Sequence, residues 1–218
     1  ALMPRPSFFL VGAPKCGTSS LCHYLRQHPE IFIPRKKELH FFAQDLELPR
    51  YFGSLDEYLD VFDGDDRQHA GEGTPWYLYS RTAAEEVRRF NPQAKVLISI
   101  RSPVDMVYSL FRFRRYTGLE QSKSLVEVLE RERAYLSGTG KSDRIVPNVI
   151  YAAAAMYTEQ IGRFLDAFGP DNVHVVFFEE LEGDPHRVYR RVLRFLGTSE
   201  DFRPDFRNVN RTGRIRSE

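Results

Sequence analysis

The feature that most constrains the fold is a short apolar run followed by a turn with two glycines near the N-terminus. Residues 7–12 form a continuous apolar run, Ser-Phe-Phe-Leu-Val-Gly, which is typical of a buried strand. The turn covers residues 12–19, and residues 20–27 then begin a helix with Leu21 and Leu25 on one face. In such an arrangement backbone N–H groups converge, and the helix dipole adds positive potential. The sequence therefore predicts a cradle for an anion at this turn.

Apolar runs and helix signals alternate along the rest of the chain. Residues 95–100 and 173–178 are two further strands by their apolar runs. This alternation predicts an α/β fold with three layers, in which helices flank a central parallel sheet, and the glycine turn after the first strand makes it a P-loop-containing fold. Such sheets bind ligands beyond the carboxyl ends of their strands. We expect helices over residues 54–62, 82–90, 125–136 and 150–168, one that begins at Pro103, and one between Asp184 and Gly197.

Two of these helices begin with a capping-box pattern. Thr82 is followed three residues later by Glu85, and Ser124 by Glu127. In a capping box the hydroxyl accepts a hydrogen bond from the backbone N–H three residues further on. The polar segment over residues 138–148 is expected to be a loop.

Composition excludes several classes of protein. The 218 residues have a formal net charge of +1, and they include 17 Phe and 11 Tyr. This balance argues against a disordered chain and against a nucleic-acid partner. No apolar run is long enough to span a bilayer, which takes about 20 residues. The length predicts a single domain over residues 1–218.

The cysteines and the first residues bear on the compartment. Cys16 and Cys22 lie six apart near a helix start, where a mutual disulfide is geometrically poor, so a disulfide framework is not expected. The first residues lack the apolar core of a signal peptide. These features favour a cytoplasmic, bacterial protein. A lumenal Golgi domain excised from a longer chain is the alternative.

The first turn has the glycine spacing of a nucleotide-binding phosphate loop, G-x-x-x-x-G-K-[ST], with Gly12 and Gly17 at the two glycine positions. The lysine of that motif is replaced by Thr18, and the one lysine of the turn is Lys15. This departure disfavours an ordinary Mg²⁺-dependent NTPase. A P-loop kinase is the alternative enzyme class, and the missing motif lysine argues against it.

A second anion site is predicted where the strand over residues 95–100 ends. Arg101 follows this strand, and Pro103 begins the next helix. Ser109 lies about two turns into that helix, roughly 9 Å along its axis. An anion near the helix start could therefore meet both side chains. Two anion sites on one sheet edge suit a ligand with two separated anionic groups.

These two sites resemble the donor site of sulfotransferases that use 3′-phosphoadenosine 5′-phosphosulfate (PAPS). Residues 13–19, Ala-Pro-Lys-Cys-Gly-Thr-Ser, are similar to the 5′-phosphosulfate loop of that family, P-K-[SC]-G-T-[ST]. Residues 100–109 resemble its 3′-phosphate motif, R-[ND]-P with a Ser eight residues after the Arg. The Lys-Glu-x-His-Phe-Phe segment is closer to the heparan-sulfate and bacterial branch than to the cytosolic steroid and phenol branch. Further similar segments follow in the order of the family, at residues 27–31, 37–42, 71–75, 178–185 and 194–197.

The resemblance implies roles for the donor-site residues. The loop N–H groups and Lys15 would hold the 5′-phosphosulfate, with Lys15 donating to the oxygen of the leaving phosphate. Arg101 and Ser109 would bind the 3′-phosphate, which separates PAPS from ATP. The product would be 3′-phosphoadenosine 5′-phosphate (PAP), and no metal is expected. The expected donor-site residues are Pro14, Lys15, Cys16, Gly17, Thr18, Ser19, Ser20, Arg101, Ser109, Arg211 and Arg214.

On the acceptor side, the resemblance implies that Glu38 is the general base, with His40 as the runner-up. The acceptor would be a hydroxyl of a carbohydrate or of a small-molecule alcohol. Trp76 and Tyr77 follow a Thr-Pro turn and are expected to line the acceptor pocket. One departure bears on this side. The branch often has Glu-Lys-[ST]-Pro where this chain has Glu-Gly-Thr-Pro at residues 72–75, so a lysine of the family is absent.

A binding module without catalysis is the alternative from another class. Such a module would bind the donor product and keep its full function in Glu38→Gln. A kinase would instead need Mg²⁺ and would prefer ATP to a 3′-phosphorylated nucleotide.

Overall fold

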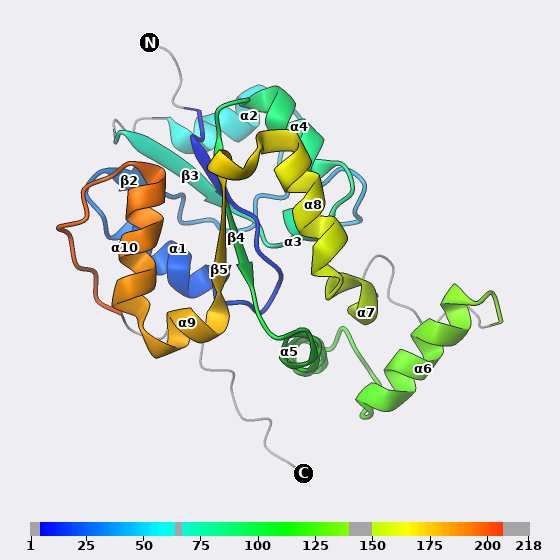
Figure 1. Cartoon of the computed structure of the whole chain (residues 1–218). Helices are drawn as coiled ribbons and strands as arrows, with labels where there is room; N and C mark the ends of the chain where they lie inside the picture. The colour runs from blue at the N-terminus through cyan, green and yellow to red at the C-terminus, as the bar shows by residue number, and fades with distance from the viewer. Residues whose placement is uncertain (1–4, 64–66, 140–149, 207–218) are drawn as a thin grey trace.

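A parallel sheet forms the centre of the fold. The computed structural model describes residues 5–63, 67–139 and 150–206. In this part of the chain the strands form a five-stranded sheet in the order β2-β3-β1-β4-β5, and each neighbouring pair is parallel (Figure 1). The prediction of a parallel α/β fold is confirmed. The strands are β1 (Phe8–Leu10), β2 (Ile31–Phe32), β3 (His69–Gly73), β4 (Lys95–Ile100) and β5 (Val173–Phe177).

Side chains of the central strands point alternately into two hydrophobic cores, one on each face of the sheet. In β1, Phe8 and Leu10 belong to one core and Phe9 to the other. In β4, Leu97 lies in the first core and Val96 in the second. Both faces of the sheet are covered, so the central strands β1 and β4 are apolar runs with buried residues on both sides. This is why β1 and β4 could be predicted from the sequence.

Helices cover the two faces of the sheet. Helices α1 (Thr18–Arg26) and α10 (Pro185–Leu196) contribute to the core that contains Phe8. Helices α3 (Trp76–Tyr79), α4 (Ala83–Phe90) and α8 (Tyr157–Phe168) contribute to the core that contains Phe9. Figure 1 shows the two groups on opposite sides of the strands. The central parallel sheet and its two helical layers therefore make the three layers that the alternation predicts.

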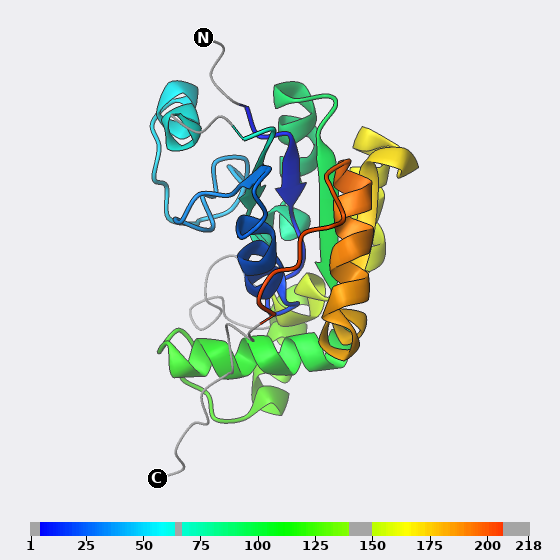
Figure 2. The same ribbon diagram turned by 90° about the vertical axis from the view of Figure 1, so that its left-hand side faces the viewer.

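The remaining helices lie around this body. Helix α5 (Pro103–Tyr116) follows β4 directly, and α6 (Leu125–Leu136) projects away from the sheet (Figure 1). Helix α2 (Leu55–Leu59), with the 3-10 turn at Asp60–Phe62, lies at the opposite side of the view from α10 (Figure 2). No helix of the described ranges combines the length and apolarity that crossing a membrane requires. The other elements are α7 (Tyr151–Ala154), a 3-10 turn at Pro170–Asn172 and α9 (Phe178–Gly183).

The helix expected over residues 150–168 is wrong in one respect, because it is broken between α7 and α8. In a continuous helix the carbonyl of Ala153 would accept the N–H of Tyr157. Here it accepts the N–H of Met156 at 3.1 Å and the side-chain amide of Gln160 at 2.8 Å. The tighter turn and the competing amide end the first helix. The last helix ends as predicted, at Gly197 in the left-handed region.

Of the two capping boxes, one is confirmed in its hydroxyl cap and one is wrong. The hydroxyl of Ser124 accepts the N–H of Glu127 at 3.3 Å. Glu127 does not return the bond, because the N–H of Ser124 donates to the hydroxyl of Ser122 at 3.1 Å. Thr82 caps nothing with its side chain, because its own backbone is already in the helical region. The hydroxyl of Ser80 takes its place and accepts the N–H of Ala83 at 3.0 Å. The expected loop at residues 138–148 lies mostly outside the described residues.

Candidate functional site

The loop after β1 is held in place by backbone contacts with β4. The N–H groups of Val11 and Ala13 donate to the carbonyls of Leu97 and Ser99, both at 2.8 Å. Gly12 lies so close to β4 that a Cβ there would be 2.5 Å from the backbone of Ser99. A side chain at position 12 would therefore separate the two strands.

The loop turns into α1 through two residues in the left-handed region, Lys15 at φ 64° and Gly17 at φ 81°. Gly17 is the N-cap of α1, and the helix has no acidic residue in its first turn. The hydroxyl of Ser99 donates to the carbonyl of Cys16 and fixes the middle of the loop. The N-terminal N–H groups of α1 are thereby presented to an anion without a competing carboxylate.

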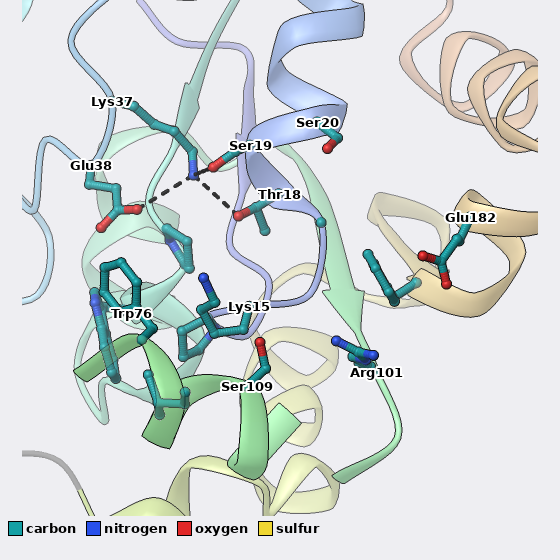
Figure 3. Close-up of a pocket in the computed structure, with 16 residues that line it drawn as sticks. Lys15, Thr18, Ser19, Ser20, Lys37, Glu38, Trp76, Arg101, Ser109 and Glu182 are labelled. Atoms are coloured by element: carbon teal, nitrogen blue, oxygen red, sulfur yellow. Dashed lines mark hydrogen bonds and ion pairs between the residues drawn. The ribbon is translucent and has the colours of Figure 1, made fainter. Parts of the chain in front are cut away.

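A cavity of about 800 Å³ opens at the carboxyl edge of the sheet (Figure 3). The loop forms its floor, α5 and α9 form two walls, and the segment after β2 forms another. Most of the expected site residues meet here. The lining residues are Pro14, Lys15, Gly17, Thr18, Ser19, Ser20, Lys37, Glu38, Pro75, Trp76, Arg101, Ser109, Leu110, Phe113, Phe178 and Glu182.

Arg101 and Ser109 line the same cavity from β4 and α5. The Arg101 guanidinium lies 4.6 Å from the ring centre of Phe178, which orients it by a cation–π contact. The Lys15 ammonium lies 4.3 Å from the ring centre of Phe113, and burial lowers the pKa of Lys15. The two cations and the helix start give the floor of the cavity a positive potential.

Glu38 faces this cavity from the other side (Figure 3). Its backbone is in the left-handed region at φ 64°, and its N–H donates to the carbonyl of Gly73 at 3.1 Å. Its carboxylate lies 3.5 Å from the Lys37 ammonium and 3.6 Å from Nε2 of His40. Burial acts to raise the pKa of Glu38, but the contact with His40 and the charge of Lys37 outweigh it and lower the pKa. The carboxylate is therefore kept ionised and able to accept a proton.

The sequence did not single out Lys37, yet its ammonium lies between Glu38 and the hydroxyls of Thr18 and Ser19 (Figure 3). It donates to the hydroxyls of Thr18 at 3.2 Å and Ser19 at 3.0 Å, besides its contact with Glu38. Its side chain passes over Gly73, where a Cβ would lie 3.6 Å from Lys37 Cε. This is an ordinary van der Waals distance, so the glycine gave no signal of the route.

Glu72 is the second residue that the sequence analysis missed. Its carboxylate is buried and accepts hydrogen bonds from the hydroxyls of Tyr58 at 2.6 Å, Thr74 at 2.6 Å and Tyr77 at 2.7 Å. The Tyr77 hydroxyl also accepts the N–H of Phe42 at 3.2 Å. Burial raises the pKa of Glu72 against these three hydrogen bonds. This cluster fixes the segment of Glu38 to the end of β3.

Three expected residues lie away from the cavity or only at its border. Tyr77 is fully buried against Glu72, whereas its neighbour Trp76 lines the cavity. Cys16 is buried as well, with its Sγ 3.4 Å from the carbonyl of Pro14, and burial raises the pKa of its thiol to about 12. His40 reaches the cavity only through Glu38, since its Nδ1 lies 3.4 Å from the carbonyl of Pro49.

Other expected features lie beyond what the structure describes. Arg211 and Arg214 lie outside the described residues. Within the described ranges, no group of three or more His, Cys, Asp and Glu side chains could hold a metal ion. The expectation of a reaction without a metal stays a prediction.

Comparisons with known proteins identify the family of this chain. The family model described as "Sulfotransferase domain" matches residues 5–209. A crystal structure of a sulfotransferase from Alicyclobacillus acidocaldarius superposes with a TM-score of 0.81 at 36% identity, covering 96% of this chain and 87% of that one. A mouse sulfotransferase solved with PAP superposes with a TM-score of 0.60 at 19% identity, covering 90% of this chain and 60% of that one, which shows the shared fold.

A second comparison is with the sequence of a mouse relative. The heparan sulfate glucosamine 3-O-sulfotransferase 6 of Mus musculus is 28% identical over 196 residues, which are 88% of this chain. The chain spans about half of the length of that relative, 52%.

Proposed function

The chain belongs to the sulfotransferase domain family, and from this premise we propose that it transfers the sulfuryl group of PAPS to a hydroxyl acceptor. One observation carries the proposal. The phosphate-binding loop lies between Arg101 with Ser109 and the carboxylate of Glu38, and all line one cavity. A donor with two anionic groups and an acceptor with a removable proton fit such a site. We propose a carbohydrate or a small-molecule alcohol as the acceptor.

The donor end is built from backbone and cations. The N–H groups at the start of α1 and the Lys15 ammonium would bind the 5′-phosphosulfate. Thr18, Ser19 and Ser20 line the cavity at the same helix start and offer hydroxyls to its oxygens. Arg101 would bind the 3′-phosphate through its planar fork of N–H donors, with Ser109 beside it. These contacts would distinguish PAPS and PAP from ATP.

The remaining donor residues carry over from the resemblance. Arg211 and Arg214 would complete the donor site from the end of the chain. Pro14, Cys16 and Gly17 would contribute through the backbone of the loop. The mouse structure that shares this fold was solved with PAP, which supports the choice of nucleotide.

The reaction would need position and charge rather than a covalent intermediate. The acceptor oxygen forms a bond to sulfur, and the bond from sulfur to the 5′-phosphate oxygen breaks. That oxygen keeps the electron pair, and Lys15 would stabilise its charge by donating a hydrogen bond. Glu38 would accept the acceptor proton, and His40 would orient the carboxylate of Glu38. We propose that no metal takes part.

A transfer assay tests this function. We would incubate the protein with ³⁵S-labelled PAPS and a phenol, a primary alcohol and a glucosamine-containing oligosaccharide. We expect label on at least one acceptor, and a rate about 100- to 10,000-fold lower in Glu38→Gln, because a positioned base is worth that much.

Glu85→Gln is the matched control, because Glu85 pairs with Arg89 on the exposed face of α4. It should transfer at the rate of the unmodified protein. Transfer of ³²P from γ-labelled ATP in place of ³⁵S would instead support a kinase. Equal transfer by Glu38→Gln and Glu85→Gln would remove Glu38 from the mechanism.

A further inference from the structure

We infer that the Lys37 ammonium links the donor loop to the base, orienting the hydroxyls of Thr18 and Ser19 toward the donor and holding the carboxylate of Glu38. Lys37 is thus a positioning residue of the transfer site. The inference rests on the proposed function, because it takes the loop as the donor site and Glu38 as the base.

The geometry accounts for all the hydrogen-bonding capacity of the ammonium. A lysine ammonium has three N–H donors and no acceptor. Its three partners are Thr18 Oγ1 at 3.2 Å, Ser19 Oγ at 3.0 Å and Glu38 Oε1 at 3.5 Å. The cation therefore lies between the two ends of the cavity and contacts both.

The contacts with the hydroxyls set the direction of their protons. A hydroxyl that accepts a hydrogen bond from an ammonium keeps its own O–H free to donate elsewhere. For Thr18 and Ser19, both in the first turn of α1, the open direction is the cavity. Two O–H donors oriented in this way add to the N–H groups of the helix start. Lys37 thus prepares the loop for an anion without binding the anion itself.

The route of the Lys37 side chain runs beside Gly73. The N–H of Glu38 donates to the Gly73 carbonyl, which fixes the backbone of the Lys37 segment beside the end of β3. A Cβ at Gly73 would lie 3.6 Å from Lys37 Cε and 2.5 Å from Cys22 Sγ. The contact with Cys22 excludes a side chain at Gly73, whereas 3.6 Å is an ordinary van der Waals distance for Lys37. Lys37 packs against this glycine, crosses the end of β3 and reaches α1, with its side chain 18% exposed.

The neighbouring lysine provides a natural contrast. The Lys36 ammonium lies 3.5 Å from the ring centre of Tyr51 and 5.5 Å from that of Phe52. Lys36 does not line the cavity. Lys36→Met removes the same charge, one residue away, and leaves the contacts of Lys37 in place. It is the matched control for Lys37→Met.

Among the described residues, Lys37 and His40 contact the carboxylate of Glu38, and Lys15 interacts with it over a longer distance. Burial raises the pKa of the Cys22 thiol, which is therefore neutral and adds no charge. Burial raises the pKa of Glu38, whereas His40 and Lys37 lower it and prevail. Loss of Lys37 leaves His40 and Lys15 in place. The pKa of Glu38 should therefore rise in Lys37→Met without reaching the value of an isolated buried carboxyl.

The first readout needs neither donor nor acceptor. We would titrate ¹³C-labelled glutamate side chains by NMR in the unmodified protein, Lys37→Met and Lys36→Met, with Glu38→Gln to assign the signal. We expect the pKa of Glu38 to rise by about one unit in Lys37→Met, because a nearby opposite charge is worth at least that much. Lys36→Met should leave it unchanged, and Lys37→Arg, which keeps the charge, should keep it low.

The second readout is the hydrolysis of PAPS to PAP and sulfate, with water as the acceptor. We expect the rate at saturating PAPS to fall about 100-fold in Lys37→Met, the scale for loss of a preorganised hydrogen-bond donor. Lys36→Met should hydrolyse PAPS like the unmodified protein. Thermal unfolding checks that each variant is folded. If Lys37→Met does not fold, Lys37→Gln, which keeps a polar end, takes its place.

The outcomes separate this inference from the proposed function. Calorimetry with PAP on the unmodified protein comes first, and a protein that does not bind PAP overturns the donor site and this inference with it. If PAP binds but Lys37→Met matches Lys36→Met in the pKa of Glu38 and in hydrolysis, only the role of Lys37 is overturned. A selective effect of Lys37→Met in both readouts supports the inference.

Discussion

The two ends of the cavity are built by different means. At the donor end, the loop from Gly12 to Ser20 is positioned by backbone hydrogen bonds with β4 and by two residues in the left-handed region. At the acceptor end, the backbone of Glu38 is also in the left-handed region and bonded to the Gly73 carbonyl, but its carboxylate is oriented by side chains, and the buried cluster around Glu72 fixes its segment. The donor end should therefore tolerate many side-chain changes, whereas the acceptor end depends on a few polar groups.

The largest expected effect comes from removing the carboxylate of the buried cluster. Glu72→Ala leaves the hydroxyls of Tyr58, Thr74 and Tyr77 without their shared partner. Each unsatisfied buried group costs about 1–3 kcal/mol, so the free energy of unfolding should fall by about 3 kcal/mol or more. Urea unfolding measures this loss. Sulfuryl transfer should fall further than PAP affinity, which calorimetry reports.

Glu132→Ala is the control for Glu72→Ala. Its carboxylate is also buried, but it accepts the N–H groups of Tyr151 and Ala152, away from the cavity. It should lower stability and leave the ratio of transfer to PAP binding unchanged. If both variants change that ratio equally, the cluster has no special part in positioning Glu38.

The next largest effect is expected from a substitution that displaces the backbone of the donor loop. Gly12→Ala would place a Cβ 2.5 Å from the backbone of Ser99. Overpacking of this kind costs about 1–3 kcal/mol, and the displaced loop should lose PAP affinity together with stability. Urea unfolding and calorimetry measure the two losses. Gly162→Ala, where a Cβ would meet nothing within 4 Å, should lower neither.

A smaller effect comes from a single side chain of the donor end. Ser109→Ala removes one hydroxyl that lines the cavity beside Arg101. A hydrogen bond contributes about 1 kcal/mol net, so the Kd for PAP should rise about fivefold. Calorimetry measures the change. An unchanged Kd would take Ser109 out of the donor site.

The smallest expected effect is the response of the reaction to acid. A base must be deprotonated, so the rate falls as the pH falls through the pKa of the base. The pKa of Glu38 is lowered from 4.5, so PAPS hydrolysis at pH 4.5 should stay within about twofold of its rate at pH 7. A pH–rate profile checks this. Loss of rate centred well above pH 4.5 would contradict Glu38 as the base.

The donor end of the cavity was easier to predict from the sequence than the acceptor end. The donor loop was predicted because its determinants, an apolar strand and glycines at fixed spacing, are adjacent in the chain. The structure brings the loop, Arg101, Ser109 and Glu38 into one cavity, as expected from the sequence. The assignment of roles to these residues stays a proposal.

The missed features depend on contacts between distant segments. Lys37 reaches the loop across the end of β3, where the N–H of Glu38 donates to the Gly73 carbonyl, and neither segment reveals this contact alone. Strand β3, His-Ala-Gly-Glu-Gly, has no apolar run, because Gly71 packs under the ring of Phe8. Tyr77 was grouped with Trp76, but adjacent residues of a helix point about 100° apart, so one faces the cavity and the other the core.

The central claim is that this cavity binds a nucleotide with a 3′-phosphate, and calorimetry without Mg²⁺ tests it most directly. PAP, ADP and ATP would be titrated into the unmodified protein, Arg101→Ala and Arg112→Ala. Arg112 is the control, because its guanidinium lies 5.9 Å from the ring centre of Tyr108 and does not line the cavity. We predict that PAP binds most tightly, and that Arg101→Ala alone loses this preference. Equal or tighter binding of ATP by the unmodified protein would contradict the account.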